Sequence, residues 1–274
     1  MICLRKKTII LSAIVLLLTS LTVWIIWSNV SIKVTQYTVS SSKLPTEFNG
    51  FRIVQISDLH NTSFGKNNQH LLEIIRNASP DVIVITGDLI DYYNPNIAVS
   101  TAFMEDAVNI APCFYVNGNH ESRLTKEYPS FRKQLLELGV TVLEDNSVLY
   151  KIGGESICIA GLSDYVSVST EFINATFQEE TYNVLLSHRP DHTEAYRNSN
   201  ADLVLCGHTH GGQLRLPFIG AVFAPGQGVF PQYDAGIFQL DDTTMIISQG
   251  LGNSSIPLRF NCRPEVVVID LACS

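Results

Sequence analysis

The sequence predicts an α/β (α+β) fold with two sheets, preceded by one transmembrane helix. Three observations support this prediction. Residues 8–27 form an uncharged apolar run. From residue 51 onward, short apolar runs rich in β-branched residues alternate with stretches of helical pattern. Beyond residue 220, short strand-like runs dominate, which indicates a second group of strands rather than a simple repeat of strand and helix.

Length, composition and charge limit the classes of function. With 274 residues, of which 46% are hydrophobic and 16% charged, the chain can build a sizeable core and is not disordered by composition. The net charge of −8 argues against a nucleic-acid partner held by bulk electrostatics. The six cysteines contain no CxxC pair, so we predict neither a zinc finger nor a disulfide scaffold.

The apolar run at residues 8–27 is long enough to cross a membrane. As a helix it would rise about 30 Å, the thickness of a bilayer core. Residues 1–7 hold three cations and no acid, which favours a cytoplasmic N-terminus, and Trp24 and Trp27 stand where the run leaves the membrane. A cleaved signal peptide is the competing interpretation, but its apolar region is usually about 7–15 residues, and "WIIWSNVS" is a poor cleavage site. We therefore expect an uncleaved single-pass anchor.

The chain is predicted to have four segments and one folded domain. The segments are a cytoplasmic basic flank (1–7), a transmembrane anchor (8–27), a strand or linker (28–49) and the domain (50–274). Near-continuous apolar runs indicate strands covered on both faces, at 51–57, 81–87, 113–118, 156–161, 182–187 and 201–206. Helical patterns occur at about 68–78, 97–110, 130–138 and 190–198.

Polar clusters follow most of the predicted strands. Open α/β sheets place their sites at the carboxyl ends of strands, so we expect these clusters to meet. Asp58 and His60 stand two apart, as do His208 and His210, and in extended backbone such residues point to one face. The clusters are "SDLH" with Asp58 and His60, "GDLID" with Asp88 and Asp91, "GNHE" with Asn119, His120 and Glu121, "SHRP" with His188, and "GHTH" with His208 and His210.

The donor types in these clusters predict a metal site. Carboxylates, imidazoles and one amide suit Mn, Fe or Zn better than Ca or Mg, which prefer oxygen ligands. About seven ligands are too many for one tetrahedral ion, so two divalent ions sharing a carboxylate fit better. We expect Asp91 to be a helix cap or a supporting partner rather than a ligand, and His70 and His192 to be surface residues.

Taken together, the motifs resemble those of the calcineurin-like metallophosphoesterases. The resemblance runs from about residue 50 to the C-terminus and rests on "SDLH", "GDLID", "GNHE", "LLSHRPD" and "CGHTHGGQLRLP". The closing stretch "GLGNSSIPLRFNCRPEVVVIDL" is similar to the membrane-anchored or exported bacterial branch, the YkuE/YaeI-like phosphoesterases. The resemblance implies a four-layer α-β-β-α sandwich, with two mixed sheets inside and helices outside.

The resemblance also implies roles for the motif residues. The implied metal ligands are Asp58, His60 and His210 for one ion, Asn119, His188 and His208 for the other, and Asp88 as the bridge between them. His120 would bind no metal and would contact the phosphate or the leaving group. Arg189 and Arg215 lie inside motifs and are candidate phosphate contacts.

Taken with the anchor, the resemblance implies a phosphodiesterase or pyrophosphatase at the outer face of the cell membrane. Two divalent ions would activate the attacking water, so no protein nucleophile is required. We expect a monomer acting on a lipid-linked or cell-envelope phosphoester, such as a UDP-diacylglucosamine-like substrate. One alternative is a phosphatase or phosphodiesterase for a soluble phosphoester. The other is a non-catalytic metal-binding scaffold. That alternative predicts that some metal-binding residues of the motifs are missing, whereas this sequence has one at every such position.

Overall fold

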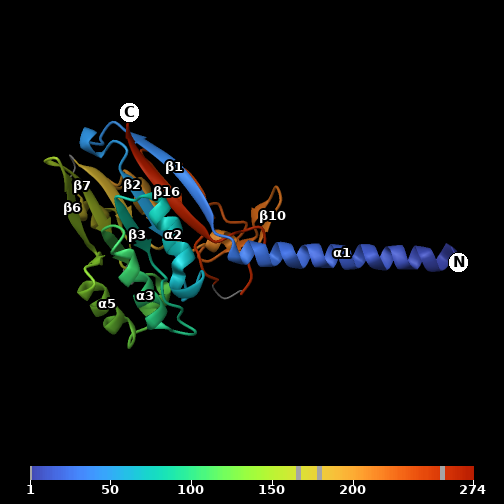
Figure 1. Ribbon diagram of the computed structural model, residues 1–274. Coiled ribbons are helices and arrows are strands. Elements are labelled where there is room, and N and C mark those ends of the chain that lie inside the picture. Colours follow the sequence, from blue (N-terminus) through green and yellow to red (C-terminus); the bar gives the residue numbers. More distant parts are fainter. Residues whose placement is uncertain (1, 165–167, 178–180, 254–256) are drawn as a thin grey trace.

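Two six-stranded sheets lie face to face at the centre of the domain (Figure 1). The computed structural model describes residues 2–164, 168–177, 181–253 and 257–274, so residues 254–256 of the closing sequence motif lie outside the described part. Both sheets contain parallel and antiparallel pairs, which confirms the predicted fold of two mixed sheets.

The first sheet combines both ends of the domain. Its strands, in spatial order, are β1 (Lys33–Ser41), β16 (Glu265–Cys273), β2 (Arg52–Ile56), β3 (Val82–Thr86), β4 (Cys113–Val116) and β5 (Thr141–Val142). β2 to β5 run parallel, and β16 is antiparallel to β2. β1 pairs with β16 along its whole length, so the segment predicted as a strand or linker supplies an edge strand of this sheet.

The second sheet is built from strands in the C-terminal half of the chain. Its strands, in spatial order, are β14 (Gly236–Leu240), β15 (Thr243–Ile247), β9 (Leu203–Cys206), β8 (Tyr182–Leu186), β7 (Glu155–Gly161) and β6 (Asn146–Ile152). The four central strands are parallel, and an antiparallel strand closes each edge. Each predicted strand therefore has a counterpart within a few residues of its expected bounds.

Helices cover the outer face of each sheet. The first sheet is covered by α2 (Gln69–Ala78), α3 (Ile97–Ala107) and α5 (Tyr128–Glu137), and the second by α6 (Thr170–Thr176) and α7 (Thr193–Arg197). Three separate apolar clusters fill the spaces between these four layers. Strand residues alternate between them, because neighbours on a strand point to opposite faces: Ile53 packs between the sheets, whereas Val54 packs under the helices.

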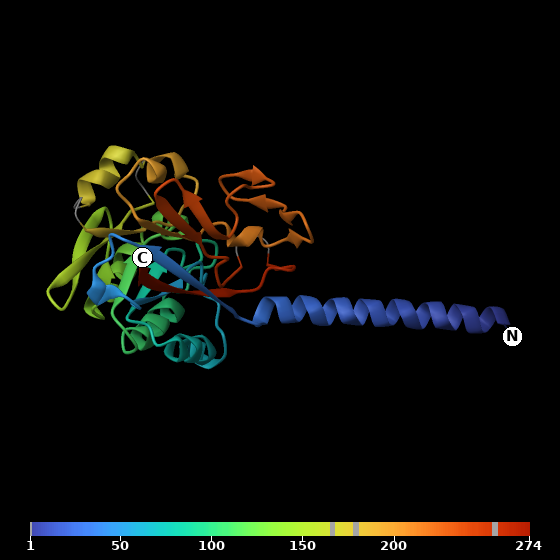
Figure 2. The same cartoon turned by 90° about the horizontal axis from the view of Figure 1, so that it is seen from above.

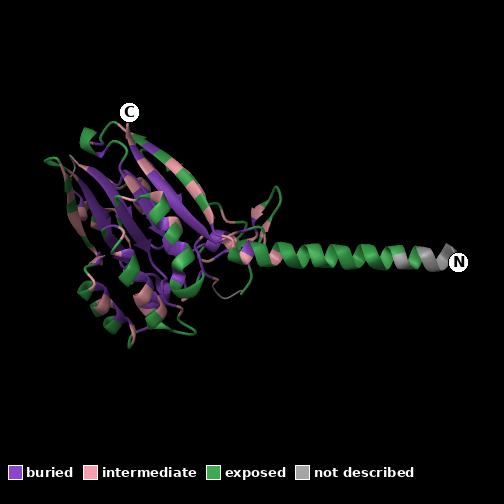
Figure 3. Ribbon diagram, in the orientation of Figure 1, coloured by how far each residue is buried: buried purple, intermediate pink, exposed green. Residues whose placement is uncertain are grey.

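The N-terminal helix α1 (Ile2–Val30) leaves the domain as a single long rod (Figures 1 and 2). Its segment Ile9–Val30 is long and apolar enough to cross a membrane, and its described surface is exposed along nearly its whole length (Figure 3). Two hydrogen bonds tie its end to the domain: the side chain of Asn29 donates to the carbonyl of Arg259 at 2.9 Å and accepts from the N–H of Arg259 at 2.8 Å.

Candidate metal centre

The predicted polar clusters meet at one edge of the sandwich, where parallel strands of both sheets end. Every proposed ligand is buried. Asp58 and His60 follow β2, Asp88 follows β3, Asn119 and His120 follow β4, His188 follows β8, and His208 and His210 follow β9. Both sheets therefore supply residues to one site, five from the first and three from the second.

The extended backbone expected for the Asp58/His60 and His208/His210 pairs is wrong. These residues have positive φ angles of 53°, 46°, 70° and 51°, and Asp88 has 53°. Such left-handed turns are costly for most residues other than glycine, and several occur together at this site. The turns direct Asp58 and His60 to one point, whereas His208 and His210 point to two different clusters.

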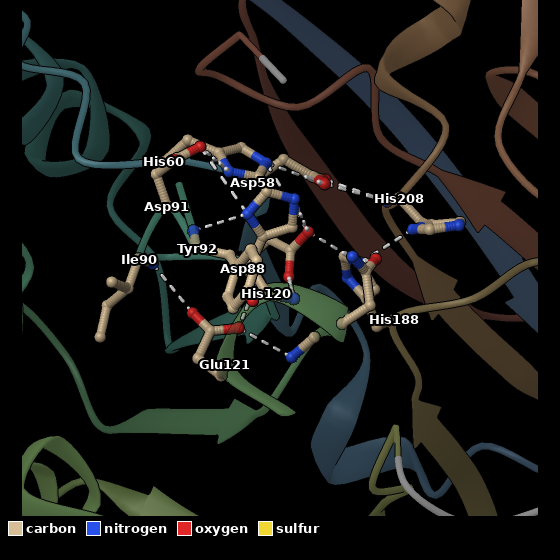
Figure 4. Close-up of polar contacts among 12 residues, drawn as sticks. Asp58, His60, Asp88, Ile90, Asp91, Tyr92, His120, Glu121, His188 and His208 are labelled. Atoms are coloured by element: carbon tan, nitrogen blue, oxygen red, sulfur yellow. Dashed lines mark hydrogen bonds and ion pairs between the residues drawn. The ribbon is translucent and has the colours of Figure 1, made fainter. Parts of the chain in front are cut away.

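Asp58, His60 and His210 form the first cluster. The two His Nε2 atoms lie 3.2 Å apart. Asp58 Oδ1 lies 3.9 Å from His60 Nε2 (Figure 4) and 3.3 Å from His210 Nε2. Three donor atoms from two separate turns thus converge, as the ligands of one ion do.

His188 is the centre of the second cluster. Its Nε2 lies 3.1 Å from Asn119 Oδ1, 3.1 Å from His208 Nδ1 and 3.2 Å from Asp88 Oδ2. The same Asp88 oxygen lies 3.6 Å from Nε2 of His60 in the first cluster (Figure 4). Asp88 therefore stands between the clusters, in the position expected of a shared carboxylate.

Backbone carbonyls and one carboxylate orient the imidazoles. His188 Nδ1 lies 2.8 Å from the carbonyl of Thr86, and His210 Nδ1 lies 3.3 Å from the carbonyl of Gly252. A carbonyl can only accept, so each Nδ1 donates its proton to it, and Nε2 is left as the metal-binding atom when the ring is neutral. Asp91 Oδ2 lies 3.4 Å from His60 Nδ1 and orients that ring in the same way as the carbonyls orient the other two. This matches the expectation that Asp91 is a supporting partner.

Burial and the neighbouring charges set the protonation states of the imidazoles and of Asp88 in the two clusters. Burial alone would lower the pKa of His188, but Asp88 raises it to about 10. Against the effect of its own burial, Asp88 has a pKa well below the usual range because of His188. Burial lowers the pKa of His208 and of His210 well below 6.5, and neighbouring imidazoles and arginines add to this. Neutral imidazoles bind metals, so His208 and His210 are already in the ligand form, whereas His188 must lose a proton when an ion binds.

His120 differs from the other imidazoles because its Nδ1 is an acceptor. It lies in the short helix α4 (Asn119–Arg123), and its Nδ1 accepts the backbone N–H of Tyr92 at 2.8 Å. Burial lowers its pKa to about 4, so the neutral ring carries its proton on Nε2. His60, Asp91 and His120 also lie close enough to hold an ion, but Nδ1 of His120 is already engaged by Tyr92.

Glu121 is a buried residue of the "GNHE" motif whose role the sequence analysis did not assign. Its carboxylate accepts the backbone N–H groups of Asp88 at 2.8 Å, Ile90 at 2.9 Å and Gly118 at 2.9 Å (Figure 4). Burial, followed by the charge of Asp88, raises its pKa to about 7. Glu121 joins the turn after β3 to the start of α4. Its spacing three residues after a glycine helix cap was the available signal.

Two motif glycines make room for the carboxylates. A Cβ on Gly118 would collide with the carboxylate of Asp88, and a Cβ on Gly207 would collide with the side chains of Ser57 and Asp58. Glycine is therefore required at both positions by close approach.

A cleft of about 260 Å³ opens onto both clusters. Besides Asp88 and four of the candidate metal-site residues it is lined by Tyr93, Arg123, Arg189, Pro225 and Gly226. Arg189 was predicted as a phosphate contact and does line the cleft, where it is held by Asp164 at 2.5 Å. Sequence reasoning missed Tyr93, Arg123 and Asp164, because none of them lies in a motif of recognised type.

Arg215, the second predicted phosphate contact, lies elsewhere. It pairs with Asp234 at 2.8 Å and donates to the carbonyl of Gly211 at 3.0 Å. It lines a different cavity, which it shares with Trp24 and Trp27 of α1. The structure therefore separates Arg215 from the cleft, because the turn after His210 carries it to the side of the domain that faces α1.

The donor set fits divalent metal ions. Among the described residues, two groups able to hold an ion are Asp58, His60 and His210, and Asp88, His188 and His208. The Nε2 atoms of His60 and His210 face one another at 3.2 Å. A cation placed there would be coordinated by the Nε2 lone pairs of both rings in their neutral form.

Comparison with known proteins agrees with this geometry. The family model of the calcineurin-like phosphoesterases matches residues 51–212. The chain belongs to the calcineurin-like phosphoesterase family. This phosphoesterase is 32% identical over 249 residues to the uncharacterized metallophosphoesterase YkuE of Bacillus subtilis strain 168, covering 88% of the chain and 85% of the relative. It is 30% identical over 230 residues to phosphodiesterase YaeI of Escherichia coli K12, covering 81% and 82%.

A solved structure shares the phosphoesterase fold. The protein TT1561 of Thermus thermophilus aligns with a TM-score of 0.50 at 12% identity, over 74% of this phosphoesterase and 91% of that chain. The family and fold implied by the sequence motifs are thus confirmed.

Proposed function

We propose that this phosphoesterase is a membrane-anchored phosphohydrolase with two divalent ions that cleaves phosphodiesters or pyrophosphates. The observation that carries the proposal is the position of Asp88 Oδ2, which lies within 3.6 Å of Nε2 atoms from both clusters. The residues that would hold the ions are Asp58, His60 and His210 in the first cluster, Asn119, His188 and His208 in the second, and Asp88 between them. When bound, such a pair of ions acidifies water and offsets charge on a phosphoryl group.

The remaining cleft residues bind and orient the substrate in this proposal. Neutral His120 presents Nε2–H and donates to a phosphoryl or leaving-group oxygen. Arg189, held by Asp164, offers its guanidinium to the phosphate. Water supplies the attacking oxygen, one P–O bond breaks, and the leaving oxygen takes up a proton. No side chain needs to form a covalent intermediate.

The substrate we propose is lipid-linked or part of the cell envelope. α1 would keep the cleft near a bilayer, and the charge asymmetry around the apolar run favours the outer face. The name of the relative YaeI, a phosphodiesterase, supports a diester rather than a monoester as the bond cleaved.

The test uses the full-length protein in detergent, loaded with Mn²⁺. We expect turnover of the chromogenic diester bis(p-nitrophenyl) phosphate, loss of turnover on chelation, and weaker turnover of p-nitrophenyl phosphate. A UDP-diacylglucosamine-type substrate in mixed micelles should compete with the chromogenic diester. Protein with two bound ions that cleaves none of the three compounds would contradict the proposal. Cleavage without competition by the lipid would assign a soluble substrate instead.

A further inference from the structure

Residues 214–230 form two short hairpins that the proposed chemistry does not explain. They are β10 (Arg215–Leu216) with β11 (Gly220–Ala221), and β12 (Phe223–Ala224) with β13 (Gly228–Val229). We call this segment the hairpin lobe. Figures 1 and 2 both show it projecting past the end of α1, beside the last turns of that helix.

The surface of the hairpin lobe is strongly apolar. Arg215 is the only charged residue between positions 214 and 230. Five large apolar side chains have exposed fractions from 53% to 110%: Phe218, Ile219, Phe223, Val229 and Phe230. So many exposed large side chains within one short segment mark an interaction surface rather than ordinary surface scatter.

The position of Arg215 places the base of the hairpin lobe beside the end of α1. Arg215 lines one cavity of about 190 Å³ together with Trp24 and Trp27 of α1. Trp24 lies six residues before Val30, the last residue of the apolar span, or about 9 Å along the helix axis. Tryptophans near the end of a span lie at the level of the lipid headgroups. The base of the hairpin lobe is therefore level with the headgroup region.

Basic residues surround the same cavity. Arg263 stacks on the ring of Trp27 at 4.5 Å, and Lys33 also lines the cavity. Glu265 pairs with Lys33 and Asp234 with Arg215, so the local excess of positive charge comes from Arg263. Cations beside tryptophans and exposed phenylalanines are the combination found where proteins enter a membrane interface.

We propose that the hairpin lobe is a second membrane contact, inserted into the interfacial region of the bilayer that α1 crosses. The turn of its second hairpin, Pro225 and Gly226, also lines the metal cleft. The lobe would thus hold one wall of the cleft at the lipid surface. This second step rests on the proposed function, whereas the membrane contact itself does not.

The test measures contact between the lobe and lipid in the full-length chain, placed at one copy per nanodisc of phosphatidylethanolamine and phosphatidylglycerol. In a Cys3→Ser/Cys273→Ser background, Phe218→Cys is labelled with the fluorophore NBD. The four other cysteines are buried and will not react: Cys113, Cys158, Cys206 and Cys262. Leu136→Cys on α5 is the matched control, since Leu136 is 47% exposed and α5 lies far from α1 (Figure 1).

We expect lipids spin-labelled near the top of the acyl chain to quench NBD at Phe218→Cys several-fold more than at Leu136→Cys. Val229→Cys, on the other hairpin, should give the same result, which guards against a local effect of one label. Equal quenching at the lobe and control positions would overturn the proposal. A change in NBD emission that occurs only with two chains per disc would also overturn the proposal, since a second copy of the chain would then cover the lobe. The measurement needs no hydrolysis, so its outcome is independent of the proposed activity.

Discussion

His60 and His210, 150 positions apart in the chain, place their Nε2 atoms 3.2 Å from one another. The Nδ1 atom of His60 faces Asp91, and that of His210 faces the carbonyl of Gly252. When both rings are neutral, each Nε2 atom presents a lone pair, so a cation can lie between them. Four loops meet here, after β2, β3, β9 and β15. A bound ion would join them, which predicts a coupling between metal binding and stability.

The first prediction is that metal stabilises the folded protein. At a free Mn²⁺ concentration of 100 times the Kd, we expect a gain of about 2.7 kcal/mol, because the folded chain binds the ion and the unfolded chain does not. The thermal unfolding midpoint in detergent should rise by roughly 5–10 °C. The control is Mg²⁺, which suits this nitrogen-rich site poorly and should give a smaller shift. An unchanged midpoint with Mn²⁺ would show that the folded chain does not bind the ion in preference to the unfolded chain.

The second prediction concerns the shared carboxylate. Asp88→Asn should lose both ions together, because its Oδ2 serves both clusters and an amide is a weaker ligand. Elemental analysis of the purified protein measures this. Asp106→Asn on α3, an exposed position, should keep the metal content of the unchanged protein. Retention of one ion in Asp88→Asn would mean that Asp88 belongs to a single cluster.

The third prediction separates His120 from the ligands. His120→Ala should keep its metal content while turnover of a diester falls about 10²–10⁴-fold, the range for loss of a general acid or base. His70→Ala, at an exposed position on α2, should change neither quantity. Loss of metal in His120→Ala would identify it as a ligand instead.

The fourth prediction concerns Glu121 and stability. Glu121→Ala leaves three buried N–H groups without their carboxylate, and each unsatisfied group costs about 1–3 kcal/mol. We expect a loss of about 3 kcal/mol or more, seen as a fall of roughly 6–12 °C in the unfolding midpoint. Glu137→Ala removes only an exposed pair with Lys133, worth about 0.3–0.5 kcal/mol. Equal midpoints for the two variants would show that water replaces the Glu121 carboxylate.

The fold could be predicted from sequence wherever strands are buried on both faces. Such strands leave continuous apolar runs, as in Val82–Thr86, and polar residues at their ends mark the edge of the sheet. The hairpin lobe could not be predicted, because two-residue strands show no periodicity. α4 is too short to show a helical pattern, and its start coincides with a motif that carries chemistry.

The residues of the candidate site could be predicted from the sequence, but the backbone geometry that orients them could not. Asp58, His60 and Asp88 stand out because polar residues directly after apolar runs are easy to recognise. The carbonyls of Thr86 and Gly252 orient imidazoles but have no side-chain signature, so no motif could reveal them. The spacing of two residues suggested extended backbone, whereas left-handed turns aim the side chains.

The last prediction concerns the orientation of α1. We expect residues 1–7 in the cytoplasm and the domain outside, because the three cations of this flank lie within reach of the inner membrane surface and acids count little. A C-terminal tag should therefore be digested when protease is added to intact spheroplasts. The variant Arg5→Ala/Lys6→Ala/Lys7→Ala is the matched control, and its tag should become partly protected as orientation is lost. Full protection of the tag in the unchanged protein would place the domain in the cytoplasm and remove the basis for an envelope substrate at the outer face. Release of a soluble, shortened protein would show cleavage of α1. The proposed metal centre is independent of both outcomes, since its proposed ligands all follow residue 50.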